Sequence, residues 1–270
     1  MDNDDVLRGR LLSRREMLAL LGGAGLVLVV GCSDDDGGDA APTAATRTQE
    51  PTRQTAAPTA TSGTSAGATS VPSCVVQPEL TEGPYFVDTQ LDRSDIRTDP
   101  ATGRASDGVP LALTVAVSRV GGDGSCEALP NAIVDVWQCD ALGVYSGVVD
   151  FQGQFDTQGQ ASLRGFQRTD TSGMARFTTI YPGWYPGRAT HIHFKIRTDD
   201  GYEYTSQWFF DDALSDEVNA LPPYAQKGAS GRLPNQDDGI YNESGDQLTL
   251  DVQPDGAGYA ARFDIGLQIA

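Results

Sequence analysis

Apolar side chains alternate with small or polar ones along several stretches of the chain. Leu111, Leu113, Val115 and Val117 alternate with alanine, threonine and serine, and the same period of two returns across residues 259–267. A period of two is typical of a strand with one buried face. Similar runs predict further strands at 131–138, 174–180, 190–197, 202–210 and 248–253. The pattern therefore predicts an all-β domain, a two-sheet β-sandwich, over residues 74–270.

A helical period is nearly absent from this region. The exception is a short segment at 213–220, begun by Asp211 or Asp212, because an aspartate side chain accepts hydrogen bonds from the free N–H groups of a first helical turn. The chain has 270 residues, 39% of them hydrophobic, with 31 glycines and 15 prolines. This composition suits a single, turn-rich β domain with one sizeable core.

The charge of the chain excludes one class of partner. The formal net charge is -18 at pH 7, whereas a nucleic-acid-binding surface needs clustered lysine and arginine. We therefore expect no nucleic-acid partner. A soluble acidic surface is sufficient to account for the charge.

Residues 1–32 have the composition of a targeting signal. Arg14 and Arg15 resemble a twin-arginine export signal, or else form the positive end of a general secretory signal. The apolar run 18–30 is shorter than the roughly 20 residues that span a bilayer. Cys32 follows a glycine, as at a lipoprotein cleavage site, or else is an ordinary thiol. We expect export to the cell surface or beyond, with a lipid anchor on Cys32 as the only membrane contact.

Residues 33–73 consist mainly of Thr, Ala, Ser, Gly and Pro, with almost no large apolar side chains. Such a segment cannot bury enough surface to offset the entropy lost on ordering. We expect a disordered linker between the signal segment and the folded domain.

Three cysteines follow the signal segment, namely Cys74, Cys126 and Cys139. Export permits a disulfide, and an odd number leaves one thiol free. Cys126 and Cys139 flank a predicted strand of about eight residues, about 26 Å long, whereas a disulfide joins Cα atoms about 4.4–6.8 Å apart. We therefore expect any disulfide to involve Cys74, and the sequence leaves its partner open.

The chain contains only two histidines, and both lie in one alternating segment, Thr190-His191-Ile192-His193-Phe194. In a strand, His191 and His193 would share one face while Ile192 and Phe194 point to the other. Two adjacent imidazoles can bind a metal ion. An HxH pair alone is also consistent with two partly exposed histidines at the edge of a sheet.

Two tyrosines accompany the histidines. Tyr145 follows a glycine turn after the strand that contains Trp137, and Tyr185 lies in a turn rich in proline and glycine. The order of these motifs resembles the catalytic core of the intradiol ring-cleavage dioxygenases, and especially the branch of that family exported from bacterial cells. The segments that carry the resemblance, within residues 74–270, are TEGPYF, RSDI, LRGFQRTD, TIYPGWYPGR and THIHFKI.

The resemblance implies a non-haem Fe(III) cofactor. Its four protein ligands would be Tyr145, Tyr185, His191 and His193. Two phenolates and two imidazoles form a mixed oxygen and nitrogen set that suits ferric iron, and coordination to a trivalent cation favours the ionised form of tyrosine.

The resemblance also implies roles for residues around the ligands. Tyr185 would leave the iron when substrate binds and take a substrate proton, Arg188 would stabilise negative charge on the ring, and Gln207 would contact the substrate. Tyr85, Leu80 and Gly143 would form walls of the substrate pocket.

The implied reaction opens a catechol-type ring between its two hydroxyls with O2 and yields a muconate-type dicarboxylate. Cytoplasmic family members have a longer link between the second tyrosine and the first histidine, whereas only five residues separate Tyr185 from His191. A shorter link predicts a more open site that admits bulkier catechols or hydroxyquinols. The oligomeric state stays open, because the helical dimerisation region of those enzymes is replaced here by the signal and linker.

Two other functions fit parts of the pattern. One is a non-catalytic β-sandwich on the cell surface that binds aromatic or carbohydrate ligands, which would not need to keep all four ligands. The other is a zinc or copper site that uses only His191 and His193. Iron bound by tyrosinate absorbs visible light and zinc does not, so the colour of the purified protein distinguishes a zinc site from the ferric site.

Overall fold

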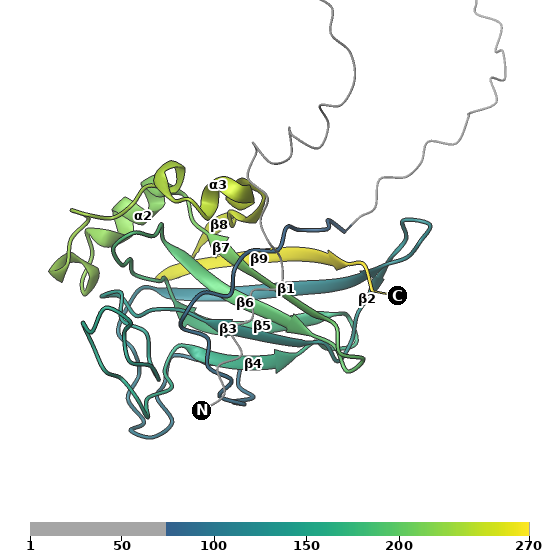
Figure 1. Cartoon of the computed structure of the whole chain (residues 1–270), viewed down its shortest axis with the longest axis horizontal. Helices are drawn as coiled ribbons and strands as arrows, with labels where there is room; N and C mark the ends of the chain where they lie inside the picture. Colours follow the sequence, from purple (N-terminus) through teal and green to yellow (C-terminus); the bar gives the residue numbers. More distant parts are fainter. Residues whose placement is uncertain (1–73, 270) are drawn as a thin grey trace, which may run out of the picture. The chain divides into compact units, whose positions relative to one another are not determined.

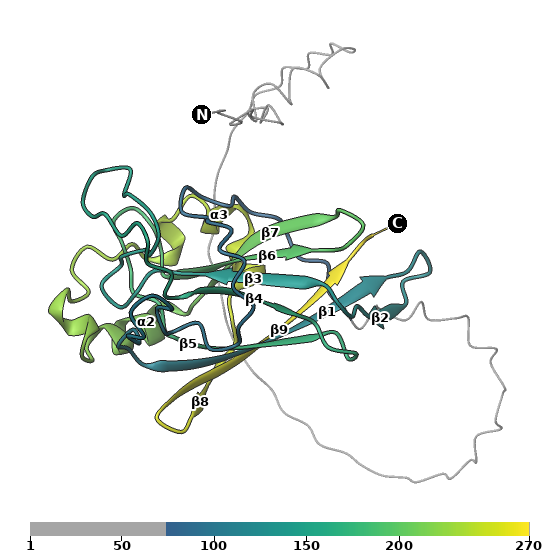
Figure 2. The same ribbon diagram turned by 90° about the horizontal axis from the view of Figure 1, so that it is seen from below.

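The computed structural model describes residues 74–269, which form a β-sandwich of two sheets (Figures 1 and 2). The strands of this part are β1 (Pro110–Val120), β2 (Cys126–Ala128), β3 (Ile133–Trp137), β4 (Arg164–Arg168), β5 (Met174–Ile180), β6 (His191–Arg197), β7 (Glu203–Phe209), β8 (Val252–Asp255) and β9 (Gly258–Leu267). The helical segments are α2 (Asp212–Asn219), α3 (Tyr241–Ser244) and the short 3-10 turns η1 (Tyr224–Gln226), η2 (Asn235–Asp237) and η3 (Gly245–Leu248). The expected all-β sandwich is confirmed.

The first sheet is built around the long strand β1. β9 lies parallel to β1 on one side, β5 and β2 pair with it on the other, and β8 extends the sheet beyond β9. The second sheet has the order β4-β3-β6-β7 and is antiparallel throughout.

The core lies between the sheets. Ile192, Phe194 and Ile196 of β6 are fully buried in it, as the alternation predicted. Phe194 stacks on Trp208 at 4.1 Å between ring centroids and meets Phe263 of the opposite sheet at 5.6 Å. Because these residues fill the inner face of β6, both histidines are directed to its other face.

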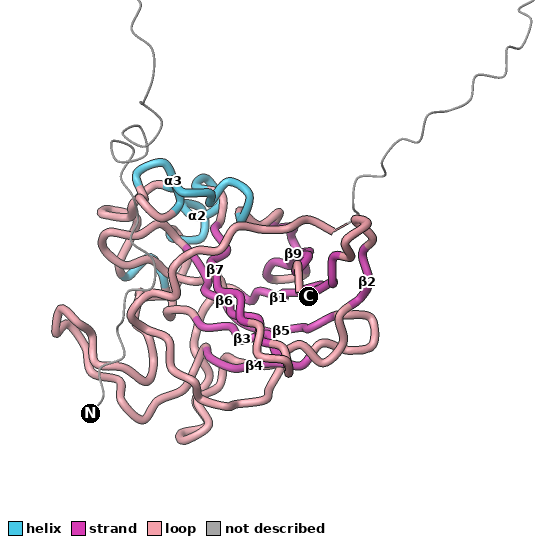
Figure 3. Tube along the Cα trace, turned by 45° about the vertical axis from the view of Figure 1, so that its right-hand side comes forward, coloured by secondary structure: helices cyan, strands magenta, loops and turns pink. Residues whose placement is uncertain are grey.

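Long connections gather at one end of the sandwich (Figure 3). They are residues 138–163 after β3, 181–190 before β6 and 210–251 after β7. β3 and β7 end where β6 begins, since Trp137 pairs with His193 and Phe209 pairs with His191. The two histidines therefore lie where these three connections meet.

Most predicted elements occur within one or two residues of their expected bounds. The helix at 213–220 is confirmed as α2, and Asp211 caps it by accepting from Leu214 N at 3.0 Å. The strand expected at 248–253 was misplaced, because η3 occupies residues 245–248 and β8 begins only at Val252. The short strands β2 and β4 were not predicted.

The disulfide joins Cys74 to Cys126, with Cα atoms 5.9 Å apart, and Cys139 is free and buried. The expected involvement of Cys74 is confirmed. Cys126 pairs with Val120 at the end of β1, and Cys74 lies against Gly266 of the neighbouring strand β9. This sheet therefore brings the two cysteines together.

The expected signal segment 1–32, the expected lipidation site Cys32 and the expected linker 33–73 lie outside the described residues. Within residues 74–269, no helix is long and apolar enough to cross a membrane.

Candidate metal centre

His191 and His193 stand side by side on β6. Their Nε2 atoms are 3.0 Å apart, and both side chains are at most 2% exposed. Trp137 of the neighbouring strand stacks on the His193 ring at 5.0 Å between centroids and an interplanar angle of 11°. Trp137, a buried core residue, thus also holds one of the two imidazoles.

The backbone fixes the orientation of His191. Its Nδ1 lies 2.7 Å from the carbonyl oxygen of Ala189, and a carbonyl can only accept a hydrogen bond. Nδ1 therefore carries the proton and Nε2 presents a lone pair. That lone pair faces the other donor atoms, as in histidines that bind metals.

The two predicted tyrosines complete the cluster. The hydroxyl of Tyr185 lies 3.3 Å from His191 Nε2, and that of Tyr145 lies 3.5 Å from the same atom. The structure thus brings together all four predicted ligands, from β6 and from the two connections that precede β4 and β6. Two phenol oxygens and the His193 nitrogen thus lie within hydrogen-bonding distance of His191 Nε2.

Close contact between those two connections sets the tyrosine positions. The Asp140 carboxylate accepts from Leu142 N and Val144 N, both at 2.9 Å, and shapes the turn that precedes Tyr145. Gly183 lies so close to this turn that a Cβ there would be 2.5 Å from Asp140 O. A side chain at residue 183 would therefore push the Tyr185 loop away.

Burial keeps the four donors neutral in the absence of a cation. It raises the pKa of Tyr145 well above its usual value, and it raises the pKa of Tyr185 to about 12 although Arg188 opposes the shift. Burial and the nearby Arg188 charge lower the pKa of His191 to about 3, and burial lowers that of His193 as well. Neutral imidazoles are ready to act as ligands, and phenols in such a site ionise when a cation replaces their protons.

This donor set fits a hard trivalent cation. No group of three or more His, Cys, Asp and Glu side chains able to hold a metal occurs among residues 74–269, so a four-donor site here requires both tyrosines. Phenolate oxygen and imidazole nitrogen together suit Fe(III). The chemistry of the residues and the fixed His191 tautomer agree with the iron that the resemblance implied.

Arg188 and Gln207 lie next to the cluster. Arg188 Nη2 donates to Gln207 Oε1 at 2.5 Å, and Nη1 lies 3.4 Å from His191 Nε2. Gln207 Nε2 donates to the carbonyl of Thr81 at 2.7 Å. A guanidinium held beside buried neutral donors can stabilise negative charge that develops there.

Of the three residues expected to form pocket walls, two line a cavity and the third lies in the core. Tyr85 stacks on Tyr145 at 4.6 Å between centroids and donates to Asp150 Oδ1 at 2.5 Å. Tyr85, Gly143 and Tyr185 line a cavity of about 60 Å³. Leu80 instead belongs to the main hydrophobic core, and its amide bonds to the carbonyl of Thr205.

Two charged residues beside the cluster were not predicted as site residues. Arg164 is 1% exposed and lies 5.9 Å from the centre of the Tyr145 ring. Asp238, also 1% exposed, forms an ion pair with Arg188 at 3.0 Å. The family motif containing Arg164 was a usable signal, whereas nothing in the sequence around Asp238 indicates a site.

Comparison with known proteins places these features in a family. Residues 81–233 match the model of a protein family described as Dioxygenase. The chain is 29% identical over 190 residues to the protocatechuate 3,4-dioxygenase beta chain of Burkholderia cepacia, a match that covers 66% of this chain and 74% of that one. It is 27% identical over 148 residues to the chlorocatechol 1,2-dioxygenase of Pseudomonas putida, covering 48% of this chain and 52% of that one.

Solved structures agree with the sequence relatives. An intradiol ring-cleavage dioxygenase from Tetranychus urticae has a TM-score of 0.62 and 29% identity, covering 72% of this chain and 95% of that one. The dioxygenase domain of a carbohydrate-binding fusion protein from Streptomyces sp. SirexAA-E has a TM-score of 0.52 and 28% identity, covering 73% of this chain and 100% of that one.

Proposed function

The chain belongs to the intradiol ring-cleavage dioxygenase family and is therefore an oxidoreductase, and on this premise we propose that it is an exported Fe(III) enzyme for catechol-type substrates. It would open the ring between the two hydroxyls with O2 to give muconate-type dicarboxylates. The observation that carries this proposal is the convergence of Tyr145, Tyr185, His191 and His193 on one point. A protein that only bound ligands would not need this buried donor set.

These four side chains would hold the iron. When bound, ferric iron supplies the Lewis acidity and redox chemistry that allow an aromatic ring to react with O2. The protein holds the donors in place through His191 Nδ1, the Trp137 stack and the two packed tyrosine loops.

The two tyrosines differ in access and therefore in role. Tyr145 is fully buried, whereas Tyr185 is partly exposed and lines the cavity. Of the two tyrosines, only Tyr185 can meet an incoming substrate. Ionised while the cation is bound, its Oη would accept the proton of a substrate hydroxyl and become a neutral phenol. Tyr145 keeps its position against Tyr85 and Arg164.

Arg188 and Gln207 would orient the ring and stabilise its charge. Removing protons from a catechol leaves negative charge on the ring, which a guanidinium in a partly buried site stabilises by a few kcal/mol. The Gln207 amide is fixed by Thr81 O and so holds Arg188 in place. This arrangement favours the charged, reacting form of the substrate over its neutral form.

The substrate class follows from the family and the cavity wall. Relatives with 29% and 27% identity are named for protocatechuate and chlorocatechol, which are substituted catechols. Tyr85 and Phe155 line the cavity beside Tyr185, and aromatic walls suit an aromatic ring. We propose substituted catechols or hydroxyquinols as substrates.

The test is oxygen uptake by the iron-loaded protein with a panel of catechols and hydroxyquinols, with the ring-opened product identified by mass. We expect one O2 consumed per muconate-type product, with both oxygen atoms incorporated from labelled gas. Products of cleavage outside the diol, or no uptake from an iron-loaded protein, would contradict the proposal.

We also propose export with retention by a lipid on Cys32. Support comes from Arg14-Arg15, the short apolar run and the Gly-Cys junction. In the native host, Cys32→Ser should move the protein from the membrane fraction to a soluble exported fraction, and Arg14→Lys with Arg15→Lys should retain it in the cytoplasm. Unchanged fractionation in both variants would contradict this localisation.

A further inference from the structure

Asp238 lies outside the family match but next to the site. It follows η2 in the long connection between β7 and β8, beyond residue 233 where that match ends. Its side chain is 1% exposed. A buried carboxylate needs charge or hydrogen-bond partners to offset the loss of hydration, so its contacts are informative.

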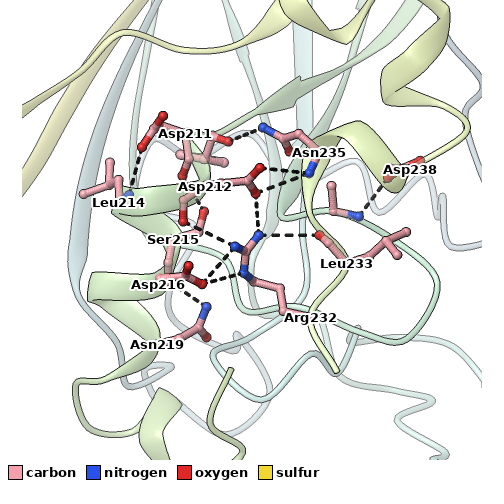
Figure 4. A network of polar contacts seen from close by, with 12 residues as sticks. Asp211, Asp212, Leu214, Ser215, Asp216, Asn219, Arg232, Leu233, Asn235 and Asp238 are labelled. Carbon is pink, nitrogen blue, oxygen red and sulfur yellow. Dashed lines mark hydrogen bonds and ion pairs between the residues drawn. The ribbon is translucent and has the colours of Figure 1, made fainter. Parts of the chain in front are cut away.

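The segment before Asp238 is held rigidly against α2 (Figure 4). The buried Arg232 guanidinium pairs with Asp212 at 2.6 Å and with Asp216 at 2.8 Å. Asn235 N donates to the Asp212 carboxylate at 3.1 Å, and Asn235 Nδ2 donates to Phe210 O at 2.8 Å. These contacts anchor residues 232–235 next to the end of β7. They therefore limit where the backbone of Asp238, three residues later, can lie.

The two carboxylate oxygens of Asp238 have different partners. Oδ1 accepts from Ile240 N at 2.8 Å, within its own segment. Oδ2 accepts from Arg188 Nε at 3.0 Å and from Ala189 N at 2.8 Å. Oδ2 therefore links the β7–β8 connection to Arg188 and Ala189, which lie just before β6 and its two histidines.

Both hydrogen-bond partners of Asp238 Oδ2 also contact residues of the candidate metal centre. With Nε held by Asp238, the two terminal nitrogens of Arg188 face His191 Nε2 and Gln207 Oε1. Ala189 donates its N–H to Asp238, and its carbonyl, in the next peptide group, orients His191 through Nδ1. The position of Asp238 thus affects the guanidinium and one ligand imidazole together.

We propose that Asp238 is a positioning residue of this site, with two separable tasks. Its negative charge fixes the Arg188 guanidinium toward the substrate, and its Oδ2 atom, as an acceptor, fixes the backbone of Ala189 and through it the His191 ring. The first task rests on the proposed function, because it concerns charge on a reacting catechol; the second concerns metal binding alone. Mutation of a residue that orients a metal ligand commonly lowers metal affinity or activity by about 10–100-fold.

Two substitutions separate the tasks. Asp238→Asn removes the charge but keeps a carbonyl oxygen for Ala189 N, so iron content and the visible absorption should stay at wild-type levels while kcat falls about 10–100-fold with a smaller change in KM. Asp238→Ala removes the acceptor as well, so iron affinity should fall in addition. Equal effects of both variants on iron affinity would overturn the division of tasks.

The matched control is Asp135→Asn. Asp135 is 7% exposed and pairs with Arg197 at 2.7 Å, on the far part of β3 and β6 from the histidines. The Asp135→Asn variant loses the same charge from the same kind of ion pair as Asp238→Asn. It should therefore lower the free energy of unfolding without lowering kcat. A kcat loss in Asp135→Asn as large as in Asp238→Asn would show a general effect of destabilisation and overturn the proposal.

A double-mutant cycle tests whether Asp238 acts through Arg188. In an Arg188→Met background, adding Asp238→Asn should lower kcat no further, because no guanidinium remains to be held. Full additivity would overturn the proposal. If Asp238→Asn does not fold, Asp238→Glu replaces it in the cycle, because it keeps the charge but displaces the carboxylate. Asp238→Glu should lower kcat when Arg188 is present and should not lower it further in Arg188→Met.

A readout without turnover separates this inference from the proposed function. In metal-free protein, the 15N-labelled Arg188 Nε–H signal should exchange slowly in the wild type and rapidly in Asp238→Asn, with Arg188→Lys used to assign it. Rapid exchange in the wild type would overturn the positioning role even if the enzyme is active. A wild type that binds iron but consumes no O2 would instead contradict the proposed function and leave the exchange result to decide the role of Asp238.

Discussion

Arg164 provides the sharpest quantitative prediction. Its guanidinium is 1% exposed and donates to the Ser146 carbonyl at 2.9 and 2.6 Å, and its Nη1 has no acceptor. Burial lowers the pKa of Arg164 to about 10, so it stays charged at neutral pH. No carboxylate lies within 4.0 Å of it among the described residues, and the nearest group that can become negative in its surroundings is Tyr145.

The magnitude follows from the separation. With the 5.9 Å from the guanidinium carbon to the centre of the Tyr145 ring taken as the charge separation, and an effective dielectric constant of about 20, a positive charge stabilises a phenolate by about 3 kcal/mol. That energy corresponds to a factor of about 100 in binding. The Tyr145 phenol ionises only when the cation is bound, and the charge of the cation itself opposes part of this gain. Arg164→Met should therefore weaken iron binding by up to about 100-fold.

The assay is competition for ferric iron between the protein and a chelator of known affinity, followed by the tyrosinate absorption. Arg164→Lys should retain most of the affinity, since it retains the charge. Arg93→Met is the matched control, because Arg93 also donates to backbone carbonyls, those of Thr98, Ala161 and Arg164, without facing either tyrosine. Wild-type iron affinity in Arg164→Met, or an equal loss in Arg93→Met, would refute the electrostatic argument.

Tyr185→Phe should retain iron on the remaining donors but lower kcat, because phenylalanine cannot accept a substrate proton; unchanged oxygen uptake would remove Tyr185 from the site. His191→Ala and His193→Ala should each abolish iron loading, and normal metal content in both would contradict the site. Cys126→Ser opens a loop of 52 residues and should lower the free energy of unfolding by about 4 kcal/mol, measured by urea denaturation without reductant; an unchanged midpoint would argue against it. Burial raises the pKa of Asp238, but Arg188 and backbone N–H donors outweigh it, so this pKa lies below the usual 3.8. The stability from Asp238 is then present above the unfolded-state pKa and lost as the pH falls through the lower folded-state value, so wild type should lose more stability below about pH 4 than Asp238→Asn; parallel pH profiles would contradict the assignment.

The sequence was informative wherever the determinant was local. The period of two in His191 to Ile196 is enough to direct both histidines to one face and the apolar residues to the core. The N-cap at Asp211 is likewise a property of four adjacent residues. Such features depend on backbone periodicity and neighbouring N–H groups, which a sequence shows directly.

Features that depend on tertiary contacts were missed. β4 begins with the charged Arg164, whose burial follows from contacts with Ser146 and Tyr145 rather than from any apolar pattern. β8 starts late because Thr249 and Leu250 bond to Gly245 and Phe209 instead of extending a strand. Asp238 reaches Arg188 across 50 residues of sequence, and no local pattern reveals such a pair.

The visible spectrum and metal content of the purified full-length protein, before and after addition of catechol under nitrogen, test the central claim most directly. We expect one iron per chain and a broad tyrosinate-to-iron absorption that shifts to longer wavelength when catechol binds. A protein that stays colourless after reconstitution with ferric iron would contradict the metal centre formed by Tyr145, Tyr185, His191 and His193.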